Sequence, residues 1–396
     1  MTTVVITGAA GFLGWHTRAR LATVPDIHVI PIDRAAFAGP DLEAALAGLG
    51  PQDAVLHLAG INRAAEDEVR DGNIALAERL ADAMATTGCQ ARTVIAGSTQ
   101  ADLIGAEATA YGIGKRRAAE HLAAAAARAG RSCVEVRLPN LYGEHGRPDY
   151  NSFVATFAHR IAGGEVPTVT GDREIPLLHV QDAVTDLWSA ALHSDPPSMI
   201  RPESVTPLRI SWIADRMASF QEVYATGQIP ALADLIDVRL FNVLRAARWD
   251  QGQLSFPLTP HSDARGDFVE VLRQHGGSGQ SSFSTTVPGV TRGDHLHFRK
   301  IERFVVVRGS GVIRLRQMCT DRLVEIPVSG DSPVAVDMPT LWTHSITNVG
   351  DDEMLTLFWI NELYNPQDAD TYPHPVLPVP AAAGSRPGGT TEGTAL

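Results

Sequence analysis

The chain has 396 residues, of which 44% are hydrophobic and 20% charged, so it is long enough for two globular domains. Its formal net charge of −12 argues against a protein that binds nucleic-acid phosphates, although a local site could still hold a nucleotide. Cys89, Cys133 and Cys319 form no Cys-x-x-Cys pair, which argues against a disulfide framework or a cysteine zinc site. With no signal peptide and no apolar run of membrane-spanning length, we expect a cytoplasmic protein without membrane or nucleic-acid partners.

Strand-like and helix-like segments alternate over residues 1–190. Alternation of this kind predicts an α/β fold with a doubly wound parallel sheet. The expected strands are 4–6, 27–32, 54–59, 93–96 and 133–137, and Ala-rich amphipathic helices are expected at 74–86 and 115–129.

The pattern changes twice further along the chain. Residues 196–250 are expected to form a helical connector, with helices at 210–220 and 230–248. After Ser255, short strand-like runs with turn signals predict an all-β sandwich or barrel. These runs are 268–272, 304–308, 311–316, 323–328, 334–337 and 354–360.

A glycine triplet follows the first expected strand. Gly8, Gly11 and Gly14 precede an expected helix at 15–21, which is the strand–turn–helix context of a dinucleotide site. Glycines there let backbone amides and a helix N-terminus approach a pyrophosphate. The alternative is a tight turn with a purely structural role.

The end of the second expected strand bears on the choice of cofactor. Asp33 is of the type that bonds the ribose hydroxyls of NAD, whereas Arg34 could hold the additional phosphate of NADP. The two signals disagree, and Arg34 could also be a solvated surface charge. We favour NADP(H).

Tyr111 and Lys115 are four residues apart and share one helix face. In such a pair the phenol protonates the alkoxide formed by hydride transfer, while the ammonium lowers the phenol pKa and binds the ribose. Ser98, at the end of a strand, would bond the substrate carbonyl, and Thr99 is the competing hydroxyl. Each hydroxyl could instead be a structural cap.

These motifs, with residues 57–60 and 137–143, resemble the extended short-chain dehydrogenase/reductase family, which has a Rossmann-type fold and acts mostly on nucleotide sugars. The resemblance implies substrate contacts from Asn62, Arg63 and Asn140, although Asn140 could equally cap a loop. The cofactor contacts that we expect are Gly8, Gly11, Phe12, Gly14, Asp33, Arg34, Leu58, Ala59, Gly60 and Lys115.

The second half contains a cluster of metal-ligand types. His295, His297 and Glu302 form His-x-His-x-x-x-x-Glu, and His344 lies downstream. Imidazole and carboxylate suit zinc, iron, manganese or nickel. The pattern resembles the two motifs of the cupin family, except that Leu341 stands where glycine is usual, which puts the local turn in doubt.

Two other interpretations of these histidines remain open. A single histidine in a barrel is more often a hydrogen-bonded core residue than a ligand. In the barrels of sugar epimerases, a histidine after Arg-Gly acts as a general base without metal, and residues 292–295 resemble that pattern, as do residues 263–268. His295 could therefore be a ligand, a base, or both.

Segments 57–63, 137–143, 147–162, 291–316 and 358–372 together resemble the bifunctional capsular-polysaccharide reductase/3-epimerase family. The resemblance implies that the cupin epimerises carbon 3 of a UDP-2-acetamido-2,6-dideoxy-4-ketohexose and that the reductase then reduces carbon 4 with NADPH. The product would be UDP-2-acetamido-2,6-dideoxy-β-L-talose, on the route to N-acetyl-L-fucosamine. It also implies zinc, or another divalent metal, on His295, His297, Glu302 and His344.

The expected domains are a reductase at 1–250, a cupin at 251–375 and a disordered tail at 376–396, in a homodimer or homotetramer. One alternative is a reductase of another UDP- or dTDP-linked 4-ketodeoxysugar whose cupin only dimerises the chain. Another is a binding protein without catalysis, which the retained Ser98, Tyr111 and Lys115 argue against.

Overall fold

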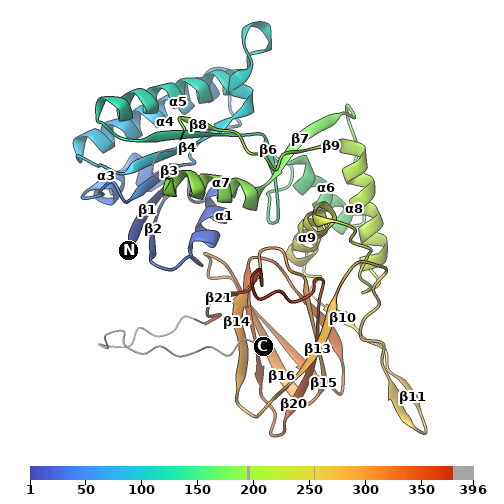
Figure 1. The fold of residues 1–396 in the computed structure, drawn as a ribbon. Coiled ribbons are helices and arrows are strands. Elements are labelled where there is room, and N and C mark those ends of the chain that lie inside the picture. Colours follow the sequence, from blue (N-terminus) through green and yellow to red (C-terminus); the bar gives the residue numbers. More distant parts are fainter. Residues whose placement is uncertain (194–196, 254, 378–396) are drawn as a thin grey trace, which may run out of the picture.

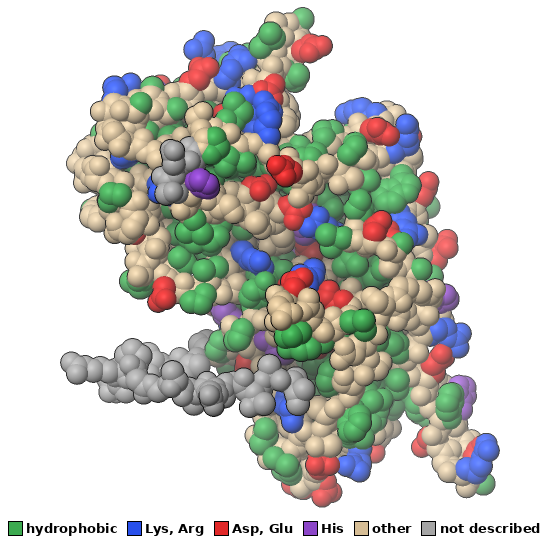
Figure 2. Space-filling model, viewed as in Figure 1, with side chains coloured by type: hydrophobic (Ala, Val, Ile, Leu, Met, Phe, Trp, Pro, Cys, Tyr) green, Lys and Arg blue, Asp and Glu red, His purple; other side chains and the backbone are tan. Residues whose placement is uncertain are grey.

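The computed structural model describes residues 1–193, 197–253 and 255–377, in which an α/β part precedes an all-β part (Figure 1). The predicted fold class is confirmed. The expected tail lies, from residue 378 on, outside the described residues. In the described part of the chain, no helix is long and apolar enough to cross a membrane. On the face shown in Figure 2, basic and acidic side chains are interspersed, so this face presents no continuous basic surface.

The central sheet is parallel throughout, with the strand order β2-β1-β3-β4-β5-β8. Its strands are β1 (Thr2–Thr7), β2 (Ile27–Ile32), β3 (Ala54–His57), β4 (Arg92–Ser98), β5 (Cys133–Leu138) and β8 (Met199–Ile200). Neighbouring residues of β1 are buried on opposite faces: Val5 packs with one apolar cluster, and Val4 and Ile6 pack with the other. Both faces are therefore covered, as a parallel sheet requires.

Two sets of helices cover these faces. The helices α1 (Phe12–Leu21) and α7 (Val180–Leu192) pack on the side of Val4 and Ile6. The opposite side carries α2 (Arg34–Ala38), α3 (Asp41–Leu46), α4 (Glu66–Thr86) and α5 (Ala110–Arg128). Two short 3-10 helices, Thr99–Asp102 and Gly105–Glu107, link β4 to α5. Strands β1 and β3 are neighbours in the sheet, and α1 begins shortly after β1 ends. A cofactor is expected at this end of the two strands.

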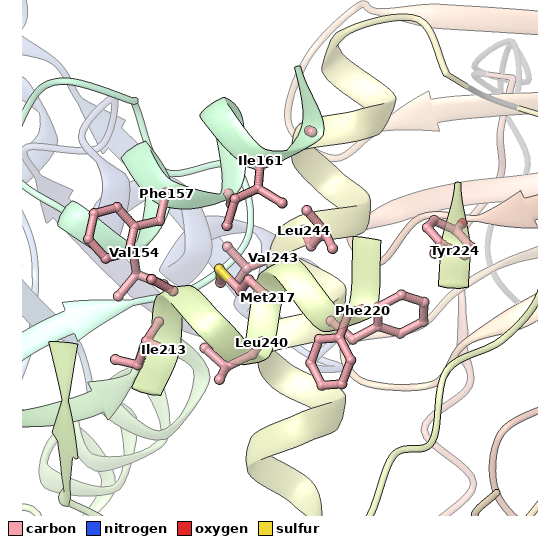
Figure 3. Packing of buried hydrophobic residues seen from close by; sticks show 14 of the residues in the cluster. Val154, Phe157, Ile161, Ile213, Met217, Phe220, Tyr224, Leu240, Val243 and Leu244 are labelled. Carbon is pink, nitrogen blue, oxygen red and sulfur yellow. The ribbon is translucent and has the colours of Figure 1, made fainter. Parts of the chain in front are cut away.

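Three helices connect the α/β part to the barrel. They are α6 (Phe153–Ala162), α8 (Ile210–Tyr224) and α9 (Leu235–Asp250), and their facing apolar side chains form one core (Figure 3). In Figure 3, side chains from all three helices point toward one another, among them Phe157, Met217 and Leu244. A small sheet beside them contains β6 (Asn140–Tyr142), β7 (Glu174–His179) and β9 (Thr206–Arg209).

Two five-stranded sheets form the barrel within the described residues, in the orders β10-β18-β15-β20-β13 and β17-β16-β19-β14-β21. A separate hairpin, β11 (His261–Asp263) and β12 (Gly266–Phe268), extends away from the body (Figure 1). The barrel strands are β10 (Ser255–Pro257), β13 (Gln280–Thr286), β14 (Thr291–Leu296), β15 (Glu302–Arg308), β16 (Ser310–Gln317), β17 (Leu323–Ser329), β18 (Val334–Met338), β19 (Trp342–Asn348), β20 (Met354–Ile360) and β21 (Tyr372–Pro373).

Helix α1 also packs against the barrel. Ala19 lies in one buried apolar cluster with Leu296, Met318 and Leu341, three barrel residues. The guanidinium carbon of Arg20 lies 4.5 Å from the ring centroid of Phe298 and 4.9 Å from that of Tyr372. The helix that follows the glycine turn is therefore shared between the two parts of the protein.

One predicted strand is wrong. Residues 269–272 form no strand, and Phe268, which ends β12, is 68% exposed. The run is mostly apolar, as the prediction required, but no strand of the described residues pairs with it. The strands expected at 304–308, 311–316, 323–328, 334–337 and 354–360 are confirmed by β15, β16, β17, β18 and β20.

Candidate active site and metal centre

The turn between β1 and α1 is built on close backbone contacts. Gly8 has a φ of 72°, and a Cβ added to it would lie 2.6 Å from the Ala59 nitrogen. A Cβ on Gly14 would lie 2.2 Å from the Gly8 oxygen. Gly11 caps α1 without a side chain, so the first amides of this helix remain open to a ligand phosphate. The residues present fit a dinucleotide.

The loop after β3 lies against this turn. The Leu58 nitrogen donates to the Thr7 carbonyl at 3.2 Å, and the Ala59 nitrogen lies 3.4 Å from the Thr7 hydroxyl oxygen. A Cβ on Gly60 would lie 3.6 Å from the Lys115 ammonium nitrogen. The predicted cofactor residues of these two segments are thus close together. Phe12 lies near a third segment, since a Cβ added to Gly143 would lie 3.4 Å from an atom of its ring.

Asp33 and Arg34 differ in what they can offer a cofactor. The Asp33 carboxylate caps α2 by accepting a hydrogen bond from the Ala36 nitrogen at 2.9 Å. Arg34 is exposed at the first position of that helix. The carboxylate that would bond a ribose is therefore partly engaged, while the guanidinium remains accessible.

Ser98, Tyr111 and Lys115 come together at the carboxyl end of β4. The Ser98 hydroxyl hydrogen-bonds the Tyr111 phenol and also accepts from the Gln100 nitrogen at 3.2 Å. Burial raises the pKa of Tyr111 to about 12, and the bond with Ser98 opposes that rise only in part. The expected lowering of the phenol pKa by Lys115 is therefore not what this structure shows. A phenol with this pKa is protonated at neutral pH, which is the form that can donate a proton.

Lys115 is buried, with 7% of its surface exposed. Burial lowers the pKa of its ammonium to about 8, and the nearby Glu135 carboxylate works in the opposite direction. His57, beneath the same loop, has its pKa lowered to about 3 by burial and by the charge of Lys115. At neutral pH, His57 is therefore uncharged while Lys115 is mostly protonated.

The remaining predicted residues of the reductase site lie around this group. Thr99 begins the 3-10 helix after Ser98, where the chain has turned away from the strand. Asn62 and Asn140 are exposed, on the loop after β3 and at the start of β6. Arg63 donates to the Asp149 carbonyl at 3.2 Å and so contacts a loop that the sequence did not connect with it.

The four predicted metal ligands converge inside the barrel. Their candidate ligand atoms all lie within 4.8 Å of one another. The Glu302 carboxylate oxygen lies 3.1 Å from His297 Nε2, 3.0 Å from His344 Nε2 and 3.8 Å from His295 Nε2. His297, Glu302 and His344 are buried, whereas the His295 side chain is 23% exposed, so the cluster opens toward solvent on the His295 side.

The charges of this cluster suit a cation. Burial lowers the pKa of His344 to about 4, which keeps the imidazole neutral and able to act as a ligand. Burial would raise the pKa of Glu302, but hydrogen bonds from the three histidines hold it well below its usual range. Three imidazoles and one carboxylate form a ligand set that fits zinc or another divalent metal.

A local irregularity in β14 lies directly before the first two histidines. The pairing of β14 with β19 shifts register between Gly293 and His295, and the residue between them, Asp294, has a φ of 56°. An inserted residue of this kind bends a strand and redirects its side chains. The His-x-His spacing predicted a shared side, but not this bulge.

Asp370 supports the site in a way that the sequence did not reveal. Its carbonyl accepts a hydrogen bond from His297 Nδ1 at 2.6 Å, which leaves Nε2 facing the cluster. Its carboxylate accepts from the backbone nitrogens of Phe298, Arg299 and Lys300 at 3.2, 2.8 and 2.8 Å. The sequence pointed to Asp370 only through its position in segment 358–372, which resembles the reductase/3-epimerase family.

Leu341 answers the doubt about the turn before His344. It adopts a φ of 65° although it is not glycine, and its side chain is fully buried. Its nitrogen donates to the His297 carbonyl at 2.9 Å, and its carbonyl accepts from the Met318 nitrogen at 3.1 Å. The turn therefore forms, and His344 lies with the other three candidate ligands.

Comparisons with known proteins agree with this architecture. Residues 4–200 match the NAD dependent epimerase/dehydratase family, and residues 261–372 match the polysaccharide biosynthesis C-terminal domain. A Pseudomonas aeruginosa protein named UDP-2-acetamido-2,6-beta-L-arabino-hexul-4-ose reductase is 32% identical over 377 residues, which cover 93% of this chain and 97% of that protein.

Solved structures show the same arrangement. The capsular polysaccharide assembling protein CapF from Staphylococcus aureus is 32% identical, with a TM-score of 0.59 over 94% of this chain and 100% of that chain. RMD from Pseudomonas aeruginosa, solved with NADPH, is 20% identical with a TM-score of 0.53 over 63% of this chain and 98% of that chain, which shows a shared fold. With its paired domains and its full-length relatives, the chain belongs to the bifunctional capsular-polysaccharide reductase/3-epimerase family, whose members include nucleotide-sugar ketoreductases.

Proposed function

We propose that the chain performs two successive reactions on a UDP-linked 2-acetamido-2,6-dideoxy-4-ketohexose. The cupin inverts carbon 3, and the reductase then reduces the carbon 4 ketone with NADPH to give UDP-2-acetamido-2,6-dideoxy-β-L-talose. The observation that supports this proposal most is the presence of two grouped side-chain sets in one chain, Ser98–Tyr111 in the α/β part and the histidine–glutamate cluster in the barrel.

In the reduction, NADPH supplies a hydride to carbon 4. Tyr111 donates the phenolic proton to the oxygen at that carbon, so the ketone becomes an alcohol. Ser98 holds the same oxygen and the phenol by hydrogen bonds, and the Lys115 ammonium binds the ribose of the cofactor.

In the epimerisation, a base removes the proton on carbon 3, which the neighbouring ketone acidifies, and a proton returns from the opposite face. A divalent metal, zinc in this proposal, would supply a positive charge that stabilises the negative charge developing during deprotonation. His297, Glu302 and His344 would hold the metal from the buried side, and the more exposed His295 lies where substrate can enter. His295 therefore remains a candidate for ligand, base or both.

The order of the two steps follows from their chemistry. Epimerisation beside a ketone is reversible and has little driving force of its own, whereas reduction removes the ketone and fixes the new configuration. The accessible Arg34 and the engaged Asp33 carboxylate favour NADP(H) over NAD. We further propose that the working form is a homodimer or homotetramer.

Incubation with NADPH and the UDP-linked 4-keto sugar in deuterated water, followed by NMR of the product, tests the proposal. We expect deuterium at carbon 3, inverted configuration there and an alcohol at carbon 4. Tyr111→Phe should lose reduction by about 10²–10⁴-fold and retain exchange at carbon 3. His295→Ala should lose exchange while the oligomer persists. Reduction without any exchange by the unmodified protein would leave the cupin with a structural role.

A further inference from the structure

Two guanidinium groups, one of them from the predicted substrate contact Arg63, gather around one tyrosine ring. The guanidinium carbons of Arg63 and Arg147 each lie 5.2 Å from the ring centroid of Tyr150. The ring is 40% exposed, and both arginines are exposed. Two like charges held near one ring repel each other, and a bound anion would relieve that repulsion.

The neighbouring carboxylates do not neutralise this pair. Asp149, the acidic residue beside Tyr150, gives its carboxylate to Arg160 at 3.1 Å, and only its carbonyl accepts from Arg63. Within residues 1–193, 197–253 and 255–377, no ion pair joins a carboxylate to Arg63 or Arg147. The cluster therefore carries two uncompensated positive charges.

The two loops that meet here begin beside the cofactor turn and the catalytic lysine. The first passes Lys115 at Gly60 and is fixed at Ile61, whose backbone makes hydrogen bonds of 3.2 and 2.8 Å with the Asn73 side chain. The second starts at Gly143, where an added Cβ would lie 3.4 Å from a ring atom of Phe12. The loops thus follow the ends of β3 and β6 and meet where Arg63 donates to the Asp149 carbonyl.

We propose that Arg63, Arg147 and Tyr150 form the subsite that binds the diphosphate of the nucleotide-sugar substrate. This inference rests on the proposed function and adds Arg147 and Tyr150 to it. Guanidinium groups match phosphate oxygens in geometry and charge, and the ring holds both groups in place. Arg63 is three residues beyond Gly60, at most about 11 Å of extended chain, so a sugar beside Lys115 leaves its diphosphate within reach.

The cofactor is a second source of phosphate, but its phosphates have other partners. The turn at Gly8 and the open amides of α1 suit its pyrophosphate, and Arg34 lies after β2, on the other side of β1 from the loop that carries Arg63. Arg63 lies three residues beyond Gly60, the last expected cofactor contact on the loop after β3. The subsite is therefore assigned to the substrate.

Binding of uridine diphosphate and, separately, of NADPH to the full-length protein tests this assignment by calorimetry. Arg147→Gln should raise the Kd for uridine diphosphate by about tenfold or more, because a charge-assisted contact is lost, and should leave the Kd for NADPH within about twofold. The matched control is Arg117→Gln, since Arg117 is exposed on α5 and pairs with Glu120 at 3.5 Å. This control should change neither Kd.

A second pair of variants examines the ring. Tyr150→Phe retains the aromatic face and should bind uridine diphosphate like the unmodified protein, whereas Tyr150→Leu should bind it several-fold more weakly. An unchanged Kd for uridine diphosphate in Arg147→Gln would overturn the proposal, as would failure of the unmodified protein to bind it. Weaker NADPH binding in Arg147→Gln would assign the arginines to the cofactor instead. If Arg147→Gln weakens the binding of uridine diphosphate but the unmodified protein never turns over the keto sugar, the proposed subsite is supported and the proposed reaction is contradicted.

Discussion

Trp15 of helix α1 donates its indole N–H to the carbonyl oxygen of Met318, 2.9 Å away, across more than three hundred residues of sequence. The Met318 nitrogen in turn donates to Leu341, and the Leu341 nitrogen donates to the carbonyl of His297. A continuous series of hydrogen bonds therefore joins the cofactor helix to a candidate metal ligand.

Trp15→Phe should lower the free energy of unfolding by about 1 kcal/mol, because it leaves the Met318 carbonyl without this donor while an aromatic ring remains. Chemical denaturation measures the change. Trp212, a tryptophan of α8 that is 40% exposed, provides the control, and Trp212→Phe should change stability by less than about 0.5 kcal/mol. Equal losses in the two variants would contradict a role for the Trp15 hydrogen bond.

The pKa of Lys115, lowered to about 8 by burial, predicts an alkaline loss of activity. The ammonium faces Glu135 of β5 and the neutral His57 of β3, and its charge disappears above that pH. The kcat/KM for NADPH should therefore fall by about tenfold per pH unit above the pKa. Lys115→Arg, whose guanidinium stays charged, should lose this limb of the profile. The same limb in Lys115→Arg would assign it to another group.

The same shift also affects stability. The folded chain releases the Lys115 proton near pH 8, whereas the unfolded chain keeps it until about pH 10.5, the ordinary pKa of a lysine. Between these values the unfolded state binds more protons, so the free energy of unfolding should rise with pH. Denaturation of Lys115→Met across this range should show a smaller rise than the unmodified protein.

Asp370→Ala should reduce metal affinity by about 10–100-fold, because it removes the carboxylate that holds the backbone between His297 and Glu302. Competition with a chelator of known zinc affinity measures this loss. Asp368→Ala is the matched control: Asp368 is two residues away, its side chain is 64% exposed, and it pairs with Arg299 at 2.8 Å. An exposed pair contributes little, so this control should bind zinc normally.

Leu341→Ala should destabilise the protein by about 3 kcal/mol, because it opens a cavity in the apolar cluster between α1 and the barrel and retains the unfavourable backbone conformation. Leu323→Ala, at a 42% exposed position of β17, should cost less than about 0.5 kcal/mol. Thermal unfolding compares the two variants. A small loss of stability in Leu341→Ala would contradict a stabilising contact between α1 and the barrel at this position.

The regular part of the fold was readable from local patterns. Apolar runs followed by glycine or amphipathic segments predicted the parallel sheet, and the His-x-His spacing predicted ligands on one side of a strand. Strand β13 escaped because its sequence is mostly serine and threonine, so it has no apolar run to detect. Antiparallel pairing with β20 makes this segment a strand, although its composition does not predict one.

Other features depended on partners far along the chain. Asp370 lies 73 residues from His297, and no local pattern connects a carbonyl at that distance to an imidazole. The Tyr111 pKa likewise depends on burial, which the Tyr-x-x-x-Lys spacing does not report. The wrong strand at 268–272 shows the converse, since a strand-like apolar run without a pairing neighbour does not form a sheet.

The sharing of helix α1 between the two parts limits how this enzyme can be recombined. A chimera that took its reductase from one relative and its barrel from another would join a foreign helix surface to Met318 and Leu341. Because Ala19 is wholly buried against that barrel, even one added methyl group there would force the parts apart. Exchange of domains among relatives should therefore succeed only when α1 travels with the barrel segments that it contacts.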